Sequence, residues 1–116
     1  MIRRNSERQS VSHPAAFGGE GHYFRRDILN CPEEFYGKGR VYSHMTLPPG
    51  CTVGYHEHHG DAEVYYFLKG HGQFNDNGNV VDIHPGDVAV TFEGQGHGMV
   101  NNGDEDMEFI AMIYYK

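Results

Sequence analysis

Turn-forming residues interrupt the chain so often from Gly39 onward that no long helix fits between them. Pro48-Pro49-Gly50, Asn75-Asp76-Asn77-Gly78 and Pro85-Gly86 are typical of tight turns, because Pro presets the backbone and Gly and Asn tolerate left-handed conformations. The segments between the turns are short and rich in β-branched and aromatic side chains, as half-buried strands are. The expected strands are residues 40–47, 52–58, 63–68, 80–84, 87–92, 97–101 and 107–115. This spacing predicts an all-β fold, a small antiparallel sandwich or barrel.

The length and composition agree with one such domain. Gly accounts for 16 of the 116 residues, about twice its usual share, and seven Phe and eight Tyr supply aromatic bulk. Residues 31–37 are expected to form one short helical turn, with Pro32 in its first position and Gly37 at its end. We therefore expect two antiparallel sheets with at most one short helical turn.

The first 21 residues differ from the rest of the chain. They are polar and end in the glycine-rich run Gly18-Gly19-Glu20-Gly21. We interpret residues 1–21 as an N-terminal arm that is flexible or crosses to a partner subunit, and residues 22–116 as the barrel. Residues 21–25 are a candidate edge strand where the two parts meet.

Charge and cysteine usage exclude several classes of function. Residues 41–116 contain two Lys, no Arg and eleven acidic residues, so the main body has no basic face for nucleic acid. No apolar run is long enough to span a membrane, and residues 1–10 lack the apolar stretch of a secretion signal. Cys31 and Cys51 form no CxxC pair, and we expect reduced thiols in a cytoplasmic protein.

Four residues in two segments suggest a metal site. Side chains alternate along a strand, so His56 and His58 share one face, and Glu63 follows on the next expected strand. An HExxH helix is excluded, because Gly60 stands where its second His would be. With His97, the set of three imidazoles and one carboxylate suits Mn²⁺, Fe²⁺ or Ni²⁺ at least as well as Zn²⁺.

These segments resemble the two motifs of the cupin family, which are small jelly-roll barrels built around a metal. The matching residues are Gly50, His56, His58, Glu63 and Gly70 in the first motif, and Gly86, Gly94, His97 and Asn101 in the second. Phe92 replaces a Pro of the second motif, a departure that touches no ligand. The resemblance implies a cupin jelly-roll barrel with one divalent metal ion per chain, held by His56, His58, Glu63 and His97. Mn or Fe is favoured, and Ni or Zn remains open.

The pocket can be placed only by assuming how strands pair. If Leu47 pairs with Thr52 across the short turn, Ser43 lies opposite His56 on the same face. In the last expected strand the alternative face contains Glu108, so the Phe109 face is turned inward. The predicted substrate pocket consists of Ser43, Met45, Phe109 and Ala111, with the small residues leaving room for a ligand.

The other face of the last strand is also apolar, with Ile110, Met112 and Tyr114. A strand that is apolar on both faces has to be covered on both. A chain this short offers little to cover the outside except a second copy. We therefore predict a two-fold homodimer.

Two hypotheses for function follow from the metal site. The first is an enzyme acting on a small oxygen-rich acid, either a carboxylic, keto or enol acid. The small cupins that this chain resembles include oxalate-decarboxylase-like proteins, and dioxygenase or isomerase chemistry is equally compatible with an open metal site. The second is a non-catalytic, metal-dependent binder of a small molecule. No proton-transfer residue is identified, and a carboxylate clamp would require Arg25, Arg26 or Arg40, since residues 41–68 contain no Lys or Arg.

Overall fold

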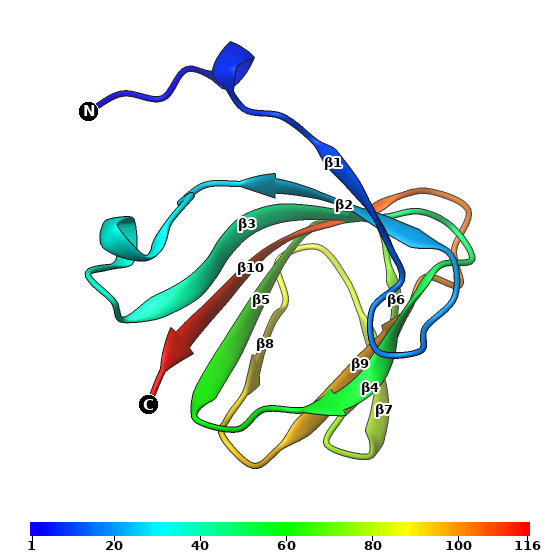
Figure 1. Ribbon diagram of the computed structural model, residues 1–116. Helices are drawn as coiled ribbons and strands as arrows, with labels where there is room; N and C mark the ends of the chain where they lie inside the picture. Colours follow the sequence, from blue (N-terminus) through cyan, green and yellow to red (C-terminus); the bar gives the residue numbers. More distant parts are fainter.

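The computed structural model describes residues 1–116 and contains two sheets in which every strand pair is antiparallel (Figure 1). Its two short helical elements are 3-10 turns, η1 (Asn5–Glu7) and η2 (Pro32–Phe35). No helix has the length and apolar character needed to cross a membrane. The strands are β1 (Val11–Pro14), β2 (His22–Asp27), β3 (Gly39–Leu47), β4 (Thr52–Glu57), β5 (Asp61–Lys69), β6 (Gly72–Asp76), β7 (Asn79–Ile83), β8 (Val88–Thr91), β9 (Gly96–Val100) and β10 (Met107–Tyr115).

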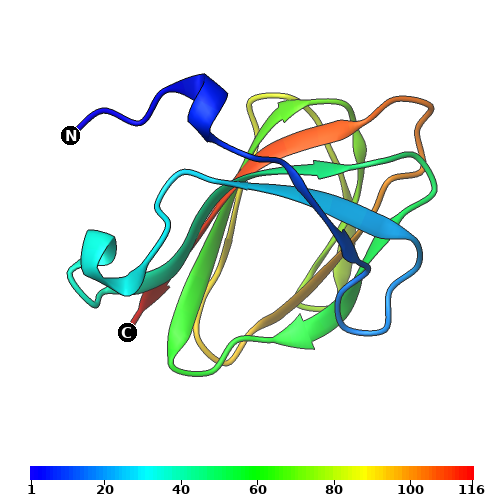
Figure 2. The ribbon, with the colours of Figure 1, turned by 45° about the horizontal axis from the view of Figure 1, so that its top comes forward.

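The two sheets form opposite walls of a barrel (Figure 2). The six-stranded sheet has the order β1-β2-β3-β10-β5-β8, and the four-stranded sheet has the order β4-β9-β6-β7. Strands β3 and β10 are neighbours although they lie at opposite ends of the barrel sequence. The chain therefore crosses repeatedly between walls, as it does in a jelly roll. The prediction of an all-β jelly-roll barrel is confirmed.

Period-2 alternation explains which side chains fill the interior. In β10, the residues Met107, Phe109, Ala111 and Ile113 are buried, and the residues between them are only half buried. Each is aligned with a residue of β3, for example Phe109 with Met45 and Ala111 with Ser43. The Phe109 face points inward as predicted, since burying a large apolar side chain stabilises the fold by about 1.5–3 kcal/mol. The core cluster is Val41, Leu47, Cys51, Tyr65, Phe67, Phe74, Ile83, Met99, Met107, Phe109, Ala111 and Ile113.

The N-terminal segment contains structure that the sequence pattern did not indicate. Residues 1–21 form η1 and the short strand β1, in addition to the expected turn η2 further along the chain. Strand β1 pairs with β2, so that β2 lies between β1 and β3 and is not itself the edge of the sheet. The segment Val11–Pro14 is too short and too polar for alternation to identify it as a strand.

The predicted pairing of Leu47 with Thr52 is wrong. Leu47 pairs with Met107 in the six-stranded sheet, whereas Thr52 pairs with Val100 in the four-stranded sheet. The turn between them passes from one wall to the other, and the Gly50 amide donates to the carbonyl of Asn101 rather than closing a hairpin. A turn signal marks where a strand ends but does not show which sheet the next strand joins.

Candidate metal centre

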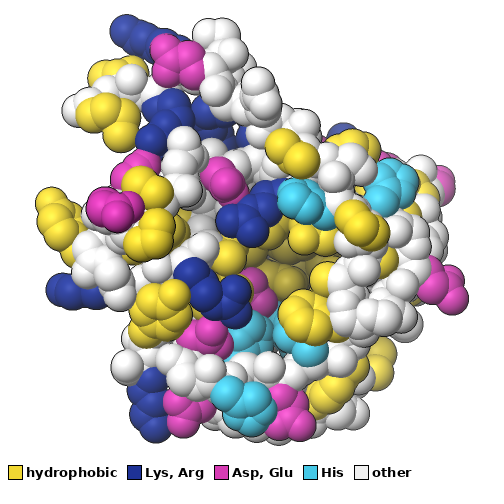
Figure 3. Space-filling view, in the orientation of Figure 1, with side chains coloured by type: hydrophobic (Ala, Val, Ile, Leu, Met, Phe, Trp, Pro, Cys, Tyr) yellow, Lys and Arg dark blue, Asp and Glu magenta, His cyan; other side chains and the backbone are white.

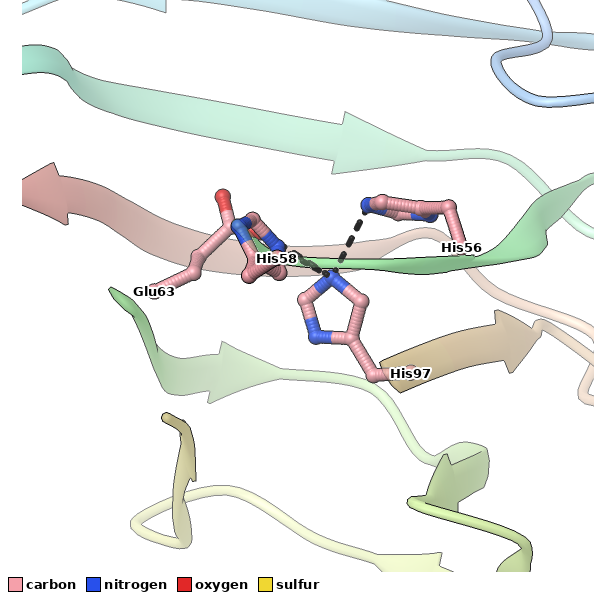
Figure 4. Close-up of side chains that lie close together, drawn as sticks. All are labelled: His56, His58, Glu63 and His97. Carbon is pink, nitrogen blue, oxygen red and sulfur yellow. Dashed lines mark hydrogen bonds and ion pairs between the residues drawn. The ribbon is translucent and has the colours of Figure 1, made fainter. Parts of the chain in front are cut away.

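The four predicted metal ligands come together where the two walls of the barrel meet. His56 lies near the end of β4, His58 directly follows that strand, and His97 on β9 is the register partner of His56. Glu63 reaches the same point from β5 in the other sheet. Figure 4 shows the four side chains pointing toward one another. His58, Glu63 and His97 are buried, and His56 is half buried.

The ligand atoms have the spacing that one metal ion requires. Nε2 of His97 lies 3.3 Å from Nε2 of His58 and 3.2 Å from Nε2 of His56. Oε1 of Glu63 lies 3.2 Å from the His58 nitrogen and 3.0 Å from the His97 nitrogen. Atoms bound about 2.1 Å from one ion are about 3.0 Å apart in adjacent octahedral positions and about 3.4 Å apart in a tetrahedron. The donor set therefore fits a single divalent cation.

Each imidazole is oriented by a second bond through its other nitrogen. Nδ1 of His56 donates to the carbonyl oxygen of Gly54 at 2.8 Å. Nδ1 of His58 lies 2.7 Å from Oδ1 of Asp61, and Nδ1 of His97 lies 2.9 Å from Oγ1 of Thr91. A carbonyl can only accept, so neutral His56 carries its hydrogen on Nδ1 and presents a lone pair at Nε2. Partners of this kind fix the tautomer and the ring orientation of metal-binding histidines.

The charges at the cluster are mutually stabilising. Burial by itself would raise the pKa of Glu63, but hydrogen bonds from His58 and His97 outweigh burial and lower that pKa. The hydrogen bond to Glu63 raises the pKa of His58, despite the opposing effect of burial. Burial lowers the pKa of His56. The cluster therefore keeps Glu63 ionised, and in the absence of a metal it favours a proton on His58.

A cavity of about 480 Å³ opens above the cluster, with His56, His58 and Glu63 in its lining. Figure 3 shows its mouth as a hollow with apolar side chains at the back and with basic and histidine side chains around it. Two of the predicted pocket residues, Met45 and Phe109, line this cavity. A ligand bound to the metal would therefore occupy an open-mouthed cavity with an apolar wall.

The other two predicted pocket residues, Ser43 and Ala111, do not line the cavity. Both are fully buried within the six-stranded sheet. The Ser43 hydroxyl donates to Oδ1 of Asp27 at 2.7 Å, since β3 pairs with β2 instead of β4. The placement of Ser43 beside His56 rested on the wrong pairing of β3 with β4. Ala111 does lie on the inward face of β10 with Phe109, but it packs in the core cluster.

Phe17 is a site residue that sequence reasoning missed. Its ring stacks on the ring of His56, with the centroids 3.6 Å apart and an angle of 11° between the planes. The segment that carries it is bound to β4, because the Gly54 amide donates to the carbonyl of Ala16 and the Thr52 amide to that of Glu20. A Cβ at Gly54 would lie 1.9 Å from the carbonyl oxygen of Phe17. Gly54 lies inside an expected strand, and a glycine in that position can indicate that another segment approaches the backbone closely.

Arg25 and Arg40 also line the cavity, whereas Arg26 does not. Arg25 lies on β2 and is aligned with Met45 of β3, so both side chains face inward. Arg26 points to the other side, where it bonds Asn5. The sequence left Arg25, Arg26 and Arg40 as equal candidates for a carboxylate clamp, and the structure retains Arg25 and Arg40.

Comparisons with known proteins agree with this architecture. The profile of the cupin domain family matches residues 43–113. The oxalate-binding protein of Thermotoga maritima is 41% identical over 113 residues, which cover 97% of this chain and 93% of that protein. The crystal structure of a predicted oxalate decarboxylase from Thermotoga maritima has a TM-score of 0.93 at 40% identity and covers 100% of both chains.

A more distant structure shows likeness of fold alone. A double-stranded β-helix protein from Klebsiella pneumoniae has a TM-score of 0.68 at 23% identity, covering 80% of this chain and 76% of that one. The family profile, by contrast, spans more than half of the chain, and the Thermotoga relative spans nearly all of it. The chain belongs to the cupin domain family.

Proposed function

We propose that the chain binds one divalent metal ion through His56, His58, Glu63 and His97. The observation that carries the proposal is the use of every Nδ1 by a protein partner, which leaves three Nε2 atoms directed at one point beside a carboxylate oxygen. The mixture of imidazole and carboxylate favours Mn²⁺ or Fe²⁺, with Ni²⁺ and Zn²⁺ as alternatives. Two buried imidazoles, one half-buried imidazole and a buried carboxylate at one point form a donor set suited to a shared cation.

The second part of the proposal is that the metal holds a small oxygen-rich acid in the cavity. A relative that covers nearly the whole chain is an oxalate-binding protein, which supports a carboxylic, keto or enol acid as ligand. A divalent metal supplies Lewis-acid polarisation of a coordinated carboxylate or carbonyl oxygen. The chain itself orients the ligand atoms of the metal and covers the site with the Phe17 segment.

The reaction, if one occurs, would be decarboxylation, dioxygenation or isomerisation of this acid. One observation favours the alternative, a non-catalytic binder. Two of the three carboxylates that line the cavity are engaged: Asp61 is paired with His58 and Arg40, and Glu63 belongs to the metal cluster. Only Glu57, which is exposed and 3.6 Å from the equally exposed His59, is left for proton transfer to a substrate.

Metal content and ligand binding test these proposals. Purified protein, stripped and reloaded with Mn²⁺ or Fe²⁺, is expected to contain one ion per chain by elemental analysis. His58→Ala should abolish loading, and His59→Ala should not, because His59 is an exposed neighbour outside the cluster. Refusal of every divalent cation by the folded wild type would overturn the proposal.

The loaded protein is then offered oxalate and a panel of keto and enol acids. Binding by calorimetry that disappears with the metal, followed by product formation, favours the enzyme. Binding without any product favours the non-catalytic binder. Absence of binding to any acid in the panel would refute the second part of the proposal and leave the metal site intact.

We also propose that two copies pair through the outer face of the six-stranded sheet. Strand registers bring apolar side chains together on this face, a contiguous patch that an isolated chain rarely exposes. The patch contains Val64, Tyr66, Val88, Val90, Ile110 and Met112. Light scattering should report a dimer for the wild type and a monomer for Val88→Lys, and a monomeric wild type would contradict the proposal.

The proposed compartment is the cytoplasm. Cys31 and Cys51 are both free, and Cys51 is buried. Unpaired thiols of this kind are typical of proteins that work under reducing conditions. Fractionation of cells that express the native protein would test the location.

A further inference from the structure

The cavity is larger than a metal-chelating acid group alone would need. Its volume of about 480 Å³ lies within the range of roughly 300–1,000 Å³ that is usual for pockets of drug-sized ligands. The metal cluster occupies only one part of its lining. The remaining wall is formed by strands β2, β3 and β10 and by the Phe17 segment. A ligand that fills the cavity would therefore extend beyond the metal and contact this wall.

Two arginines supply the charge on this second wall. Arg25 points inward because it shares a face with Tyr23, which also lines the cavity. Arg40 reaches the cavity through an irregularity in β3. Val41 pairs with Ile113 and Gly39 with Tyr114, so Arg40 is the extra residue of a bulge. Bulges commonly redirect a side chain in this way beside a binding site.

Each guanidinium is held by one carboxylate and keeps its terminal groups free. Nε of Arg25 donates to Oδ1 of Asp27 at 2.6 Å, and Nε of Arg40 donates to Oδ2 of Asp61 at 3.2 Å. The Nη groups of both arginines make no hydrogen bond with the protein. They remain available for an anion, and a guanidinium binds a carboxylate through two parallel N–H groups.

The supporting carboxylates are themselves fixed. Asp27 accepts a hydrogen bond from the hydroxyl of the buried Ser43, and Asp61 bonds Nδ1 of His58 on its other oxygen. Arg40 is therefore connected through one residue to a predicted metal ligand. Two arginines positioned in advance lose less side-chain entropy on binding than free surface arginines would.

We propose that Arg25 and Arg40 form an anion subsite that binds the second acid group of a ligand whose first acid group lies on the metal. The inference rests on the proposed metal site and narrows its ligand to a diacid longer than oxalate. The two acid groups of oxalate share one C–C bond and can both chelate the metal, which would leave no acid group for the arginines. A suitable diacid has an oxygen-rich end for the metal, a second acid group for the arginines, and a carbon chain between them that contacts the apolar surface.

The experiment measures binding to the metal-loaded protein by calorimetry. The probes are oxalate, a series of dicarboxylates and 2-oxo-dicarboxylates of increasing length, and the monoacid analogue of each. We expect one of the longer diacids to bind at least about tenfold more tightly than its monoacid analogue. Arg25→Gln and Arg40→Gln should each weaken that diacid by about 10- to 100-fold, because each loses a charge-assisted bond, and should leave the monoacid unchanged.

Arg26→Gln is the matched control, since Arg26 is adjacent on the same strand and bonds Asn5 outside the cavity. Arg25→Lys and Arg40→Lys keep the charge without the planar fork, and an intermediate affinity for the diacid is expected from each. These variants also serve if a Gln variant fails to fold. Metal content is measured for every variant.

The outcomes separate the two proposals. If metal-loaded Arg25→Gln and Arg40→Gln bind every diacid as tightly as the wild type does, the metal site stands and the anion subsite is overturned. Equal affinity of the wild type for diacids and their monoacid analogues would overturn it as well. Failure of the wild type to load metal would overturn the proposed function and this inference with it.

Discussion

The metal cluster and the arginine wall, by which we mean Arg25 and Arg40, lie in one cavity but are built in different ways. Every imidazole in the cluster is fixed by a second hydrogen bond, and three of its four side chains are buried. Arg25 and Arg40 are each held through one nitrogen, with 29% and 50% of the side chain exposed. A rigid cluster suits a metal with strict geometry, whereas a half-exposed wall can adapt to different ligands. We therefore expect the cluster to determine the chemistry of the bound acid and the arginines to determine which acid binds.

Asp61 belongs to both regions, so its removal should have the largest effect. Asp61→Ala removes the partner of His58 and the partner of Arg40 together. We expect metal affinity to fall by about 100-fold, at the upper end of what the loss of an orienting partner costs. Titration with Mn²⁺ measures the change. Asp82→Ala, which removes an exposed carboxylate on β7, is the control, and equal metal affinity in the two variants would show that Asp61 does not support the cluster.

The pH dependence of metal binding tests the charges of the cluster. The metal must displace the proton that Glu63 favours on His58, whose pKa is raised. Below that pKa, metal affinity should fall about tenfold per pH unit, and above it affinity should level off. In the metal-free protein, the contribution of this ion pair to the free energy of unfolding should instead fall as pH rises. The pair of His58 with Glu63 is present at lower pH and is lost as pH rises through the raised pKa of His58. Metal titrations and melting curves between about pH 6 and pH 8 test both signs, and a flat metal affinity would contradict the assignment.

Removing the hydroxyl of Thr91 should affect the cluster alone. Thr91→Val preserves shape but removes the oxygen that lies 2.9 Å from Nδ1 of His97. Metal affinity should fall about tenfold, while the preference for a diacid over its monoacid analogue stays unchanged. Thr46→Val on β3 serves as the control, since its side chain lies outside the cluster. A shifted diacid preference in Thr91→Val would mean that the two regions are not independent.

The smallest effect is expected from the Phe17 segment that covers the cluster. Phe17→Ala removes the stacking on His56, an interaction worth about 0.5–1.5 kcal/mol, and should weaken metal binding by about 2- to 10-fold. Tyr36→Ala is a suitable control, because Tyr36 is another exposed aromatic residue with a positive φ but directly follows the turn η2, outside the cavity. If both variants bind metal as the wild type does, the stacking contributes nothing to the cluster.

The sequence predicted the metal cluster better than the arginine wall, because part of the cluster follows from the alternation of neighbouring residues in one strand. His56 and His58 share a face because alternation within one strand is a property of neighbouring residues. The placement of Ser43 depended on which strand lies beside β3, and that assumption failed. Arg40 lies in a bulge, where alternation no longer indicates the face of a side chain. The position of Phe17 depends on contacts with Gly54, far away in the sequence.

By itself, the sequence determined the all-β class, most of the turns between strands, and the four residues able to hold a metal. Only the tertiary structure decided which wall each strand joins, that Met45 and Phe109 line the cavity while Ser43 and Ala111 do not, and that Arg25 lines the cavity while Arg26 bonds Asn5 outside it. The physical reason is that turn chemistry and alternation act between adjacent residues. Strand partners and close approaches are instead selected by the packing of distant segments around one shared core.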